Sequence, residues 1–63
     1  MNLDVLAENV RRFRSVKRLS QPRLADAAGV DAQTIKNLEA SRVEPRMRTL
    51  QAISRALEVP LRD

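Results

Sequence analysis

The spacing of apolar residues along this chain is helical almost throughout, and one glycine and three prolines are its main interruptions. Residues on one face of an α-helix recur every three or four positions, whereas a half-buried strand alternates at every second position. Glycine and proline break such patterns most strongly. Because Pro22, Gly29, Pro45 and Pro60 divide the chain into short pieces, residues 1–63 predict a single all-α domain of four to five short helices.

The apolar stripes set the expected bounds of the helices. We expect helices over about 3–17, 32–40 and 47–57, a short second helix that begins within residues 20–22 and ends before Gly29, and residues 59–63 could begin a fifth. Two residues could be the N-cap of the second helix. Ser20 is a good N-cap by its residue type. However, the residue before a proline avoids the α region, which favours Gln21 as the N-cap and Pro22 as the first helical residue. The expected inward-facing side chains are Leu3, Leu6, Ala7, Val10 and Phe13, then Leu24, Ala25 and Ala28, then Ile35 and Leu38, and finally Met47, Leu50, Ile53 and Leu57.

The charge of the chain is basic, with 12 Lys and Arg residues against 8 Asp and Glu, and a formal net charge of +4. A small basic domain is a candidate for binding nucleic acid or an anionic membrane surface. The alternative is that the charge only keeps a small domain soluble. Charge by itself does not separate these interpretations.

Several classes of protein are disfavoured by what the sequence lacks. There is no cysteine or histidine, which removes disulfides, thiolate chemistry and most zinc sites. We therefore expect no enzyme activity, no metal or other cofactor, and no small-molecule ligand. The apolar runs are too short to span a membrane, and the N-terminus does not resemble a signal peptide. These features predict a cytoplasmic protein with no membrane partner.

Residues from about 21 to 38 have the pattern of a helix-turn-helix, two short helices joined by a tight turn. Ala25 is small where the two helices must approach closely, and Gly29 lies where the turn needs an unhindered backbone. Val30 is an apolar plug in the turn, and Asp31 is a good N-cap for the following helix. A pair of helices held in this way can project the second one into the major groove of DNA.

The outward face of the third helix carries the candidate base-reading residues Ala32, Gln33, Lys36 and Asn37. Glutamine and asparagine can bond adenine through two hydrogen bonds, lysine can donate to guanine, and a small alanine can touch a thymine methyl group. The alternative is an ordinary solvated helix surface. Within the whole helix-turn-helix pattern, we favour base reading.

Candidate contacts to the DNA backbone surround this helix. The amide of Gln21 and the free N–H groups at the start of the second helix can hold a phosphate. Arg23 lies in the same turn, and Arg42 and Arg46 lie in the loop after the third helix, from where they could reach a phosphate or the minor groove. Each charge taken alone could instead be only solvated.

Arg14 and Glu39 are charged residues on apolar stripes, one on the first helix and one on the third. Moving an ion out of water costs several kcal/mol unless it is paired. We predict that the two side chains form a buried structural pair. The alternative is that Arg14 extends its guanidinium to solvent along its own apolar stem.

The run Leu19-Ser20-Gln21-Pro22-Arg23-Leu24-Ala25, followed by Ala28-Gly29-Val30, Ile35, Leu38-Glu39, Pro45, Leu50, Ala56-Leu57 and Val59, resembles the Cro/C1-type helix-turn-helix family. That family includes lambdoid phage repressors and xenobiotic-response-element-like regulators. The resemblance implies a lambda-repressor-like fold, a phosphate contact at Gln21, base reading at Ala32, Gln33 and Asn37, and a buried Arg14–Glu39 pair. It also implies a minor-groove contact at Arg46 and a dimer seam at Val59 and Leu61, since Leu57 is expected in the core.

Four residues depart from the family pattern. Ser41 and Glu58 stand where glycine often ends a helix, Ser54 replaces a usual alanine, and Arg23 replaces a usual acidic residue. A non-glycine residue with positive φ costs about 1 kcal/mol, so these two helix ends are expected to fray or to use another cap.

These observations together predict a transcriptional regulator of the repressor type, associated with the nucleoid, that binds double-stranded DNA. We expect it to act as a homodimer on an inverted repeat. One alternative is a protein-interaction module such as an antitoxin. Another is the DNA-binding part of a longer regulator.

Overall fold

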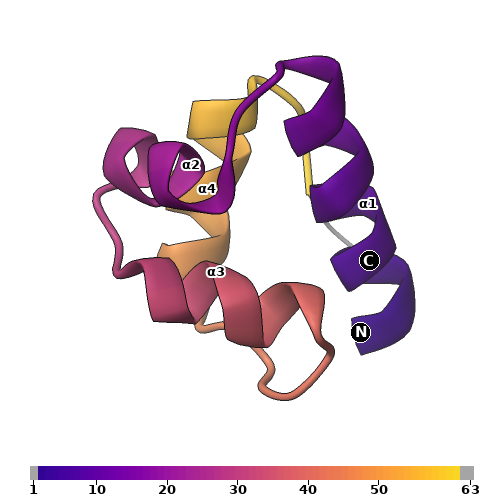
Figure 1. Ribbon diagram of the computed structural model, residues 1–63. Helices are drawn as coiled ribbons and strands as arrows, with labels where there is room; N and C mark the ends of the chain where they lie inside the picture. The colour runs from indigo at the N-terminus through magenta and orange to yellow at the C-terminus, as the bar shows by residue number, and fades with distance from the viewer. Residues whose placement is uncertain (1, 62–63) are drawn as a thin grey trace.

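The computed structural model of the protein describes residues 2–61. Their regular structure consists of α1 (Leu3–Val16), α2 (Gln21–Ala28), α3 (Ala32–Glu39) and α4 (Met47–Leu57). In Figure 1, α1 forms one side of the molecule, α3 lies below α2, and α4 lies behind them. The expected all-α fold is therefore confirmed. No helix within residues 2–61 is long and apolar enough to cross a membrane.

The core is built from apolar side chains of all four helices. Val10, Leu24, Ile35 and Ile53, one from each helix, have no exposed surface. Met47 was expected on the inner stripe of α4, but 66% of its surface is exposed. The reason is its position as the first residue of α4, one turn before Leu50, where the helix has not yet reached the core.

Side chains cap the first three helices at their N-termini. Asn2 Oδ1 accepts hydrogen bonds from the N–H groups of Asp4 and Val5, and Asp31 Oδ1 accepts one from Gln33 at 2.7 Å. Ser20 Oγ accepts from the N–H of Arg23 at 3.1 Å, so Ser20 and not Gln21 is the N-cap of α2. A following proline disfavours the α conformation, yet Gln21 is helical here. The hydrogen bond from the Ser20 cap therefore outweighs the effect of Pro22.

All four helices end in the same way, with a residue in the left-handed conformation. These residues are Arg18, Gly29, Ser41 and Glu58, with φ values of 58°, 70°, 57° and 59°. The N–H of the next residue then bonds to the carbonyl five positions back, as in Val30 to Ala25 at 3.0 Å. This is the Schellman motif, which satisfies carbonyls that the helix leaves unpaired. Ser41 and Glu58 therefore adopt the conformation of the glycine that they replace.

The segment after α4 turns back toward α1 without forming a fifth helix in its described part, residues 59–61 (Figure 1). Ser54 Oγ donates to the carbonyl of Val59 and accepts from the N–H of Leu61 at 2.9 Å. Leu61 is only 6% exposed and belongs to the core. The expectation that Leu61 is free to form a dimer seam is therefore wrong, because the chain uses this side chain to cover its own core. Residues 62 and 63 of the expected fifth helix lie outside the described residues.

Candidate nucleic-acid interface

The helix-turn-helix consists of α2, α3 and the turn between them. Gly29 ends α2 with its φ of 70°, and Val30 packs against the core in the turn. Ile35 and Leu38 hold the inner face of α3, with exposed fractions of 0% and 2%. The opposite face of α3 is consequently fixed in direction by buried contacts.

Two amide side chains are joined on that outward face. Gln33 Nε2 donates to Asn37 Oδ1 at 3.0 Å, across one turn of α3. Gln33 and Lys36 are exposed and Asn37 is half-buried. Ala32 differs from these three, because it packs against the core and is itself half-buried. Less of its methyl group is therefore available to a base than the sequence pattern implied.

The predicted pair of Arg14 and Glu39 is present in the structure and is bidentate. Arg14 Nε donates to Glu39 Oε2 at 2.7 Å, and Arg14 Nη2 donates to Glu39 Oε1 at 2.9 Å. Glu39 is 5% exposed and Arg14 is half-buried. The hydrogen bonds that Arg14 donates to Glu39 raise the pKa of Arg14 against the opposing effect of burial, so the guanidinium remains charged.

This pair is the centre of a polar network that sequence reasoning did not foresee. Arg14 Nη1 donates to the carbonyl of Leu19 at 2.9 Å, and Gln21 Nε2 donates to Glu39 Oε1 at 3.0 Å. Arg11 donates to the carbonyl of Glu39 at the end of α3. The network ties α1, the start of α2 and the end of α3 together, so it fixes the orientation of the helix-turn-helix. Arg11 therefore has a structural role in this network.

The comparison with known families matches this architecture. A family model described as "Helix-turn-helix" matches residues 11–63, which include α2, α3 and α4. The chain belongs to the Cro/C1-type helix-turn-helix family. This is a family of DNA-binding transcription regulators, so the resemblance seen in the sequence is confirmed.

One curated relative of this helix-turn-helix chain is "Control protein C.SmaI" from Serratia marcescens. The two chains are 35% identical over 54 residues, which cover 86% of this chain and 64% of the relative. The chain thus spans less than two thirds of the length of that protein.

The residues predicted to contact the DNA backbone differ in their exposure. Arg23 lies in the first turn of α2, and Arg42 and Arg46 lie in the connection between α3 and α4; all three are exposed. Gln21 is half-buried, and its amide nitrogen is bonded to Glu39 through one of its two hydrogens. The second hydrogen is left for another acceptor.

Val59, the other residue of the predicted dimer seam, is half-buried and packs against the core.

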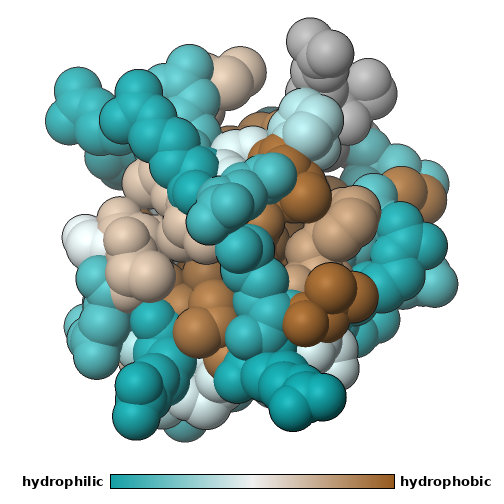
Figure 2. Space-filling model, turned by 90° about the horizontal axis from the view of Figure 1, so that it is seen from above, coloured by the Kyte–Doolittle hydropathy of each residue, from teal (hydrophilic) through white to brown (hydrophobic). Residues whose placement is uncertain are grey.

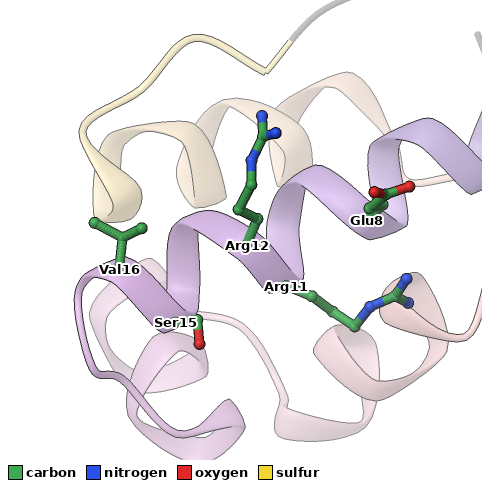
Figure 3. Close-up of a pocket in the computed structure, with 5 residues that line it drawn as sticks. All are labelled: Glu8, Arg11, Arg12, Ser15 and Val16. Atoms are coloured by element: carbon green, nitrogen blue, oxygen red, sulfur yellow. The ribbon is translucent and has the colours of Figure 1, made fainter.

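One hollow among the described residues lies on α1 and is open to solvent. A shallow depression of about 590 Å³ on α1 is lined by Glu8, Arg11, Arg12, Ser15 and Val16. Figure 3 shows Arg12 and Val16 pointing toward the segment after α4, while Arg11 points to the other side toward α3. These side chains diverge, so the depression is open to solvent and does not surround a small molecule. Within residues 2–61, no group of three or more acidic residues could hold a metal ion.

Some hydrophobic surface lies at the end of the molecule away from α3. Figure 2 shows hydrophobic side chains among hydrophilic ones on this face, which is the top of the molecule in Figure 1. Val16, the last residue of α1, is 74% exposed. An ion pair of 3.1 Å between Lys17 Nζ and Glu58 Oε1 joins the ends of α1 and α4.

Proposed function

We propose that this protein binds a specific sequence of double-stranded DNA by inserting α3 into the major groove, and that it regulates transcription from that site. The observation that carries the proposal is the outward face of α3, where Gln33, Lys36 and Asn37 present hydrogen-bonding groups on a helix fixed by buried contacts. The major groove admits one α-helix and offers a distinct pattern of donors and acceptors for each base pair.

The surroundings of α3 support contacts to the DNA backbone. Arg23, Arg42 and Arg46 supply positive charge from both sides of the reading helix, and Gln21 keeps one amide hydrogen for a phosphate oxygen. Such contacts position a protein on the duplex, whereas base contacts give sequence specificity. In this proposal, residues 1–63 act as one DNA-binding domain in the cytoplasm, at the nucleoid.

The regulatory part of the proposal rests on the family and on the relative, which is named a control protein. We propose a repressor-like regulator that occupies an inverted repeat as a homodimer. One reading helix covers only a few base pairs, so a second copy doubles the sequence that is read. Because Leu61 is buried, its side chain is unavailable for the seam in this fold, and Val59 offers only part of its surface.

The test is an electrophoretic titration of the protein against duplexes recovered from a randomised pool and against unselected duplexes. We expect a recovered sequence to bind at least about 1,000-fold more tightly than random DNA. Equal affinity for both would contradict sequence-specific binding. Absence of binding to any duplex would favour a protein-interaction module.

A further inference from the structure

The outer face of α1 carries exposed apolar side chains that the proposed DNA contact does not use. Among the described residues, four large hydrophobic side chains are exposed, and two of them, Val5 at 53% and Val16 at 74%, lie on α1. An α-helix has 3.6 residues per turn, so these two valines are about three turns apart and lie on the same side of α1. Single valines on a surface need no explanation, whereas aligned ones can contact a partner.

Two opposite charges lie between these valines on the same side of α1. Glu8 follows Val5 by one turn, and Arg12 precedes Val16 by one turn. Side chains three or four positions apart are neighbours on a helix surface. Glu8 and Arg12 are both exposed. We call Val5, Glu8, Arg12 and Val16 the α1 stripe.

The α1 stripe is turned away from the reading helix. Figure 3 shows Arg12 and Val16 pointing toward the segment after α4, whereas Arg11 points to the other side, toward α3. Arg12 is held on its side of α1 by two contacts. Its Cζ atom lies 5.0 Å from the centre of the Phe13 ring, and its Nη2 donates to Asn9 Oδ1 at 3.3 Å. A contact through the α1 stripe therefore does not involve α3.

The order of the side chains in the α1 stripe is complementary to its own reverse. When a second α1 lies antiparallel to the first, Val5 meets Val16 of the second copy, and Glu8 meets Arg12. Two-fold symmetry then repeats each of these contacts. In a parallel arrangement each charge would meet its own kind. We infer that the α1 stripe is a surface on which a second copy of this chain docks, with the two α1 helices antiparallel.

The depression on α1 has a form that another helix can cover. Glu8, Arg11, Arg12 and Ser15 line it, and they follow one another at steps of three, one and three positions. Four residues with this spacing form the hole that receives a side chain from a packed helix. Such a hole is shallow and open until the second helix lies on it, in agreement with the open depression seen here.

This association is weak and independent of DNA. A helix of 14 residues is about 21 Å long, so two of them bury less surface than the roughly 1,200 Å² of a stable specific interface. The dimer should therefore form only at high protein concentration. Its ion pairs are exposed, so salt should weaken it. The inference does not rest on the proposed function.

The experiment is sedimentation equilibrium of the native protein without DNA, from about 10 μM to 1 mM, at low and at high salt. We expect the apparent mass to rise from monomer toward dimer with concentration, and to rise less at high salt. A protein that stays monomeric over the whole range at low salt overturns the inference, and this face would then belong to another partner or to none.

Charge reversals test the antiparallel pairing. Arg12→Glu and Glu8→Arg each place like charges opposite one another, so each variant alone should associate more weakly than the native protein. The expected loss is about 2- to 25-fold, because an exposed ion pair contributes about 1.4- to 5-fold and the dimer has two. An equimolar mixture of the two variants should associate again, since every arginine then faces a glutamate.

The matched control is Arg48→Glu, on the exposed surface of α4, which makes the same change in net charge as Arg12→Glu and should not weaken association. Circular dichroism checks that each variant folds. Val16→Ser, which removes an exposed apolar contact, should also weaken association and serves if a charge variant is unfolded. Equal effects of Arg12→Glu and Arg48→Glu, or a mixture that associates no better than its components, would overturn the inference. DNA binding by the native protein is measured separately, so the proposed function stands or fails on its own.

Discussion

At the scale of single residues, three of the four helices end with a non-glycine residue in the left-handed conformation that glycine adopts with the least strain. Arg18, Ser41 and Glu58 all have a positive φ near 58°, and only Gly29 fits that conformation without strain. Left-handed backbone costs a residue with a Cβ roughly 1–2 kcal/mol. The Schellman hydrogen bonds that follow each of these residues compensate for part of this cost.

Replacing Ser41 by glycine should stabilise the fold. The substitution relieves the left-handed strain, and the greater freedom of glycine in the unfolded chain offsets about 0.4–1 kcal/mol of that gain. We expect Ser41→Gly to raise the free energy of unfolding by about 0.5–1 kcal/mol in urea denaturation. Ser41→Ala is the control, since it removes the hydroxyl and keeps the Cβ. An equal effect of alanine and glycine would show that backbone strain is not the cause.

At the scale of helices and their connections, the sequence predicts what local patterns determine. The expected bounds of α1 and α3 differ from the observed ones by one residue at their C-terminal ends, and those of α4 agree. The positions of Arg14 and Glu39 on the apolar stripes of α1 and α3 also predicted the pair that these residues form. The burial of Leu61 was not predictable in this way, because it depends on where Ser54 anchors the segment after α4. The bonds of Gln33 to Asn37 and of Gln21 to Glu39 depend on side-chain rotamers that apolar spacing does not specify.

The Arg14–Glu39 pair should be a major contributor to stability. Arg14→Ala leaves the carboxylate of Glu39, which is 5% exposed, without its charged partner. Breaking a fully buried pair costs about 3–5 kcal/mol, and the partial exposure of Arg14 reduces this to about 2–3 kcal/mol. Thermal or urea unfolding would measure the loss, with Arg48→Ala, an exposed arginine on α4, as the control. Equal losses in the two variants would contradict a structural role for the pair.

Ser54 should hold the segment after α4 against the core. Ser54→Ala removes the acceptor of the Leu61 N–H and the donor to the Val59 carbonyl. We expect a net loss of about 1 kcal/mol of stability, because alanine favours the helix slightly more than serine. Hydrogen exchange of the Leu61 amide should accelerate, whereas Ser15→Ala on the exposed surface of α1 should leave it unchanged. Unaltered protection of Leu61 in Ser54→Ala would mean that packing alone holds this segment.

At the scale of the whole molecule, the fold divides the arginines into those that are bonded within the protein and those that remain on its surface. Arg11 and Arg14 are bonded within the polar network, while Arg23, Arg42 and Arg46 remain on the surface near α2 and α3. The net charge of +4 therefore does not show how many positive charges lie on the surface near α2 and α3. Sequence composition could not make this distinction, because it does not show which charges are bonded internally.

DNA affinity should depend steeply on salt, and the surface arginines should determine the slope. Each phosphate neutralised contributes about −0.9 to the slope of log K against log salt concentration. Arg42→Ala and Arg46→Ala should each reduce the magnitude of the slope by about 1 and weaken binding to all sequences similarly. Arg12→Ala, on α1 against Phe13, should leave the slope unchanged. A slope that none of these variants alters would place the phosphate contacts on other residues.

The proposed dimer can be tested through the DNA with the protein unmodified. Two copies related by a two-fold axis present their α3 helices to the same side of the duplex, so their half-sites should lie about one helical turn, roughly 10 base pairs, apart. Inserting about 5 base pairs between the half-sites turns one of them to the opposite side, where the two copies no longer meet. Titration should show cooperative occupation of the native spacing and independent occupation of the two half-sites after this insertion. A further insertion to a full turn restores the facing but moves the copies about 34 Å further apart, to about 68 Å between the half-site centres, so the contacts made at the native spacing are lost. Cooperativity should therefore stay absent at that spacing, and a protein that fills all three arrangements in the same way would be acting as a monomer.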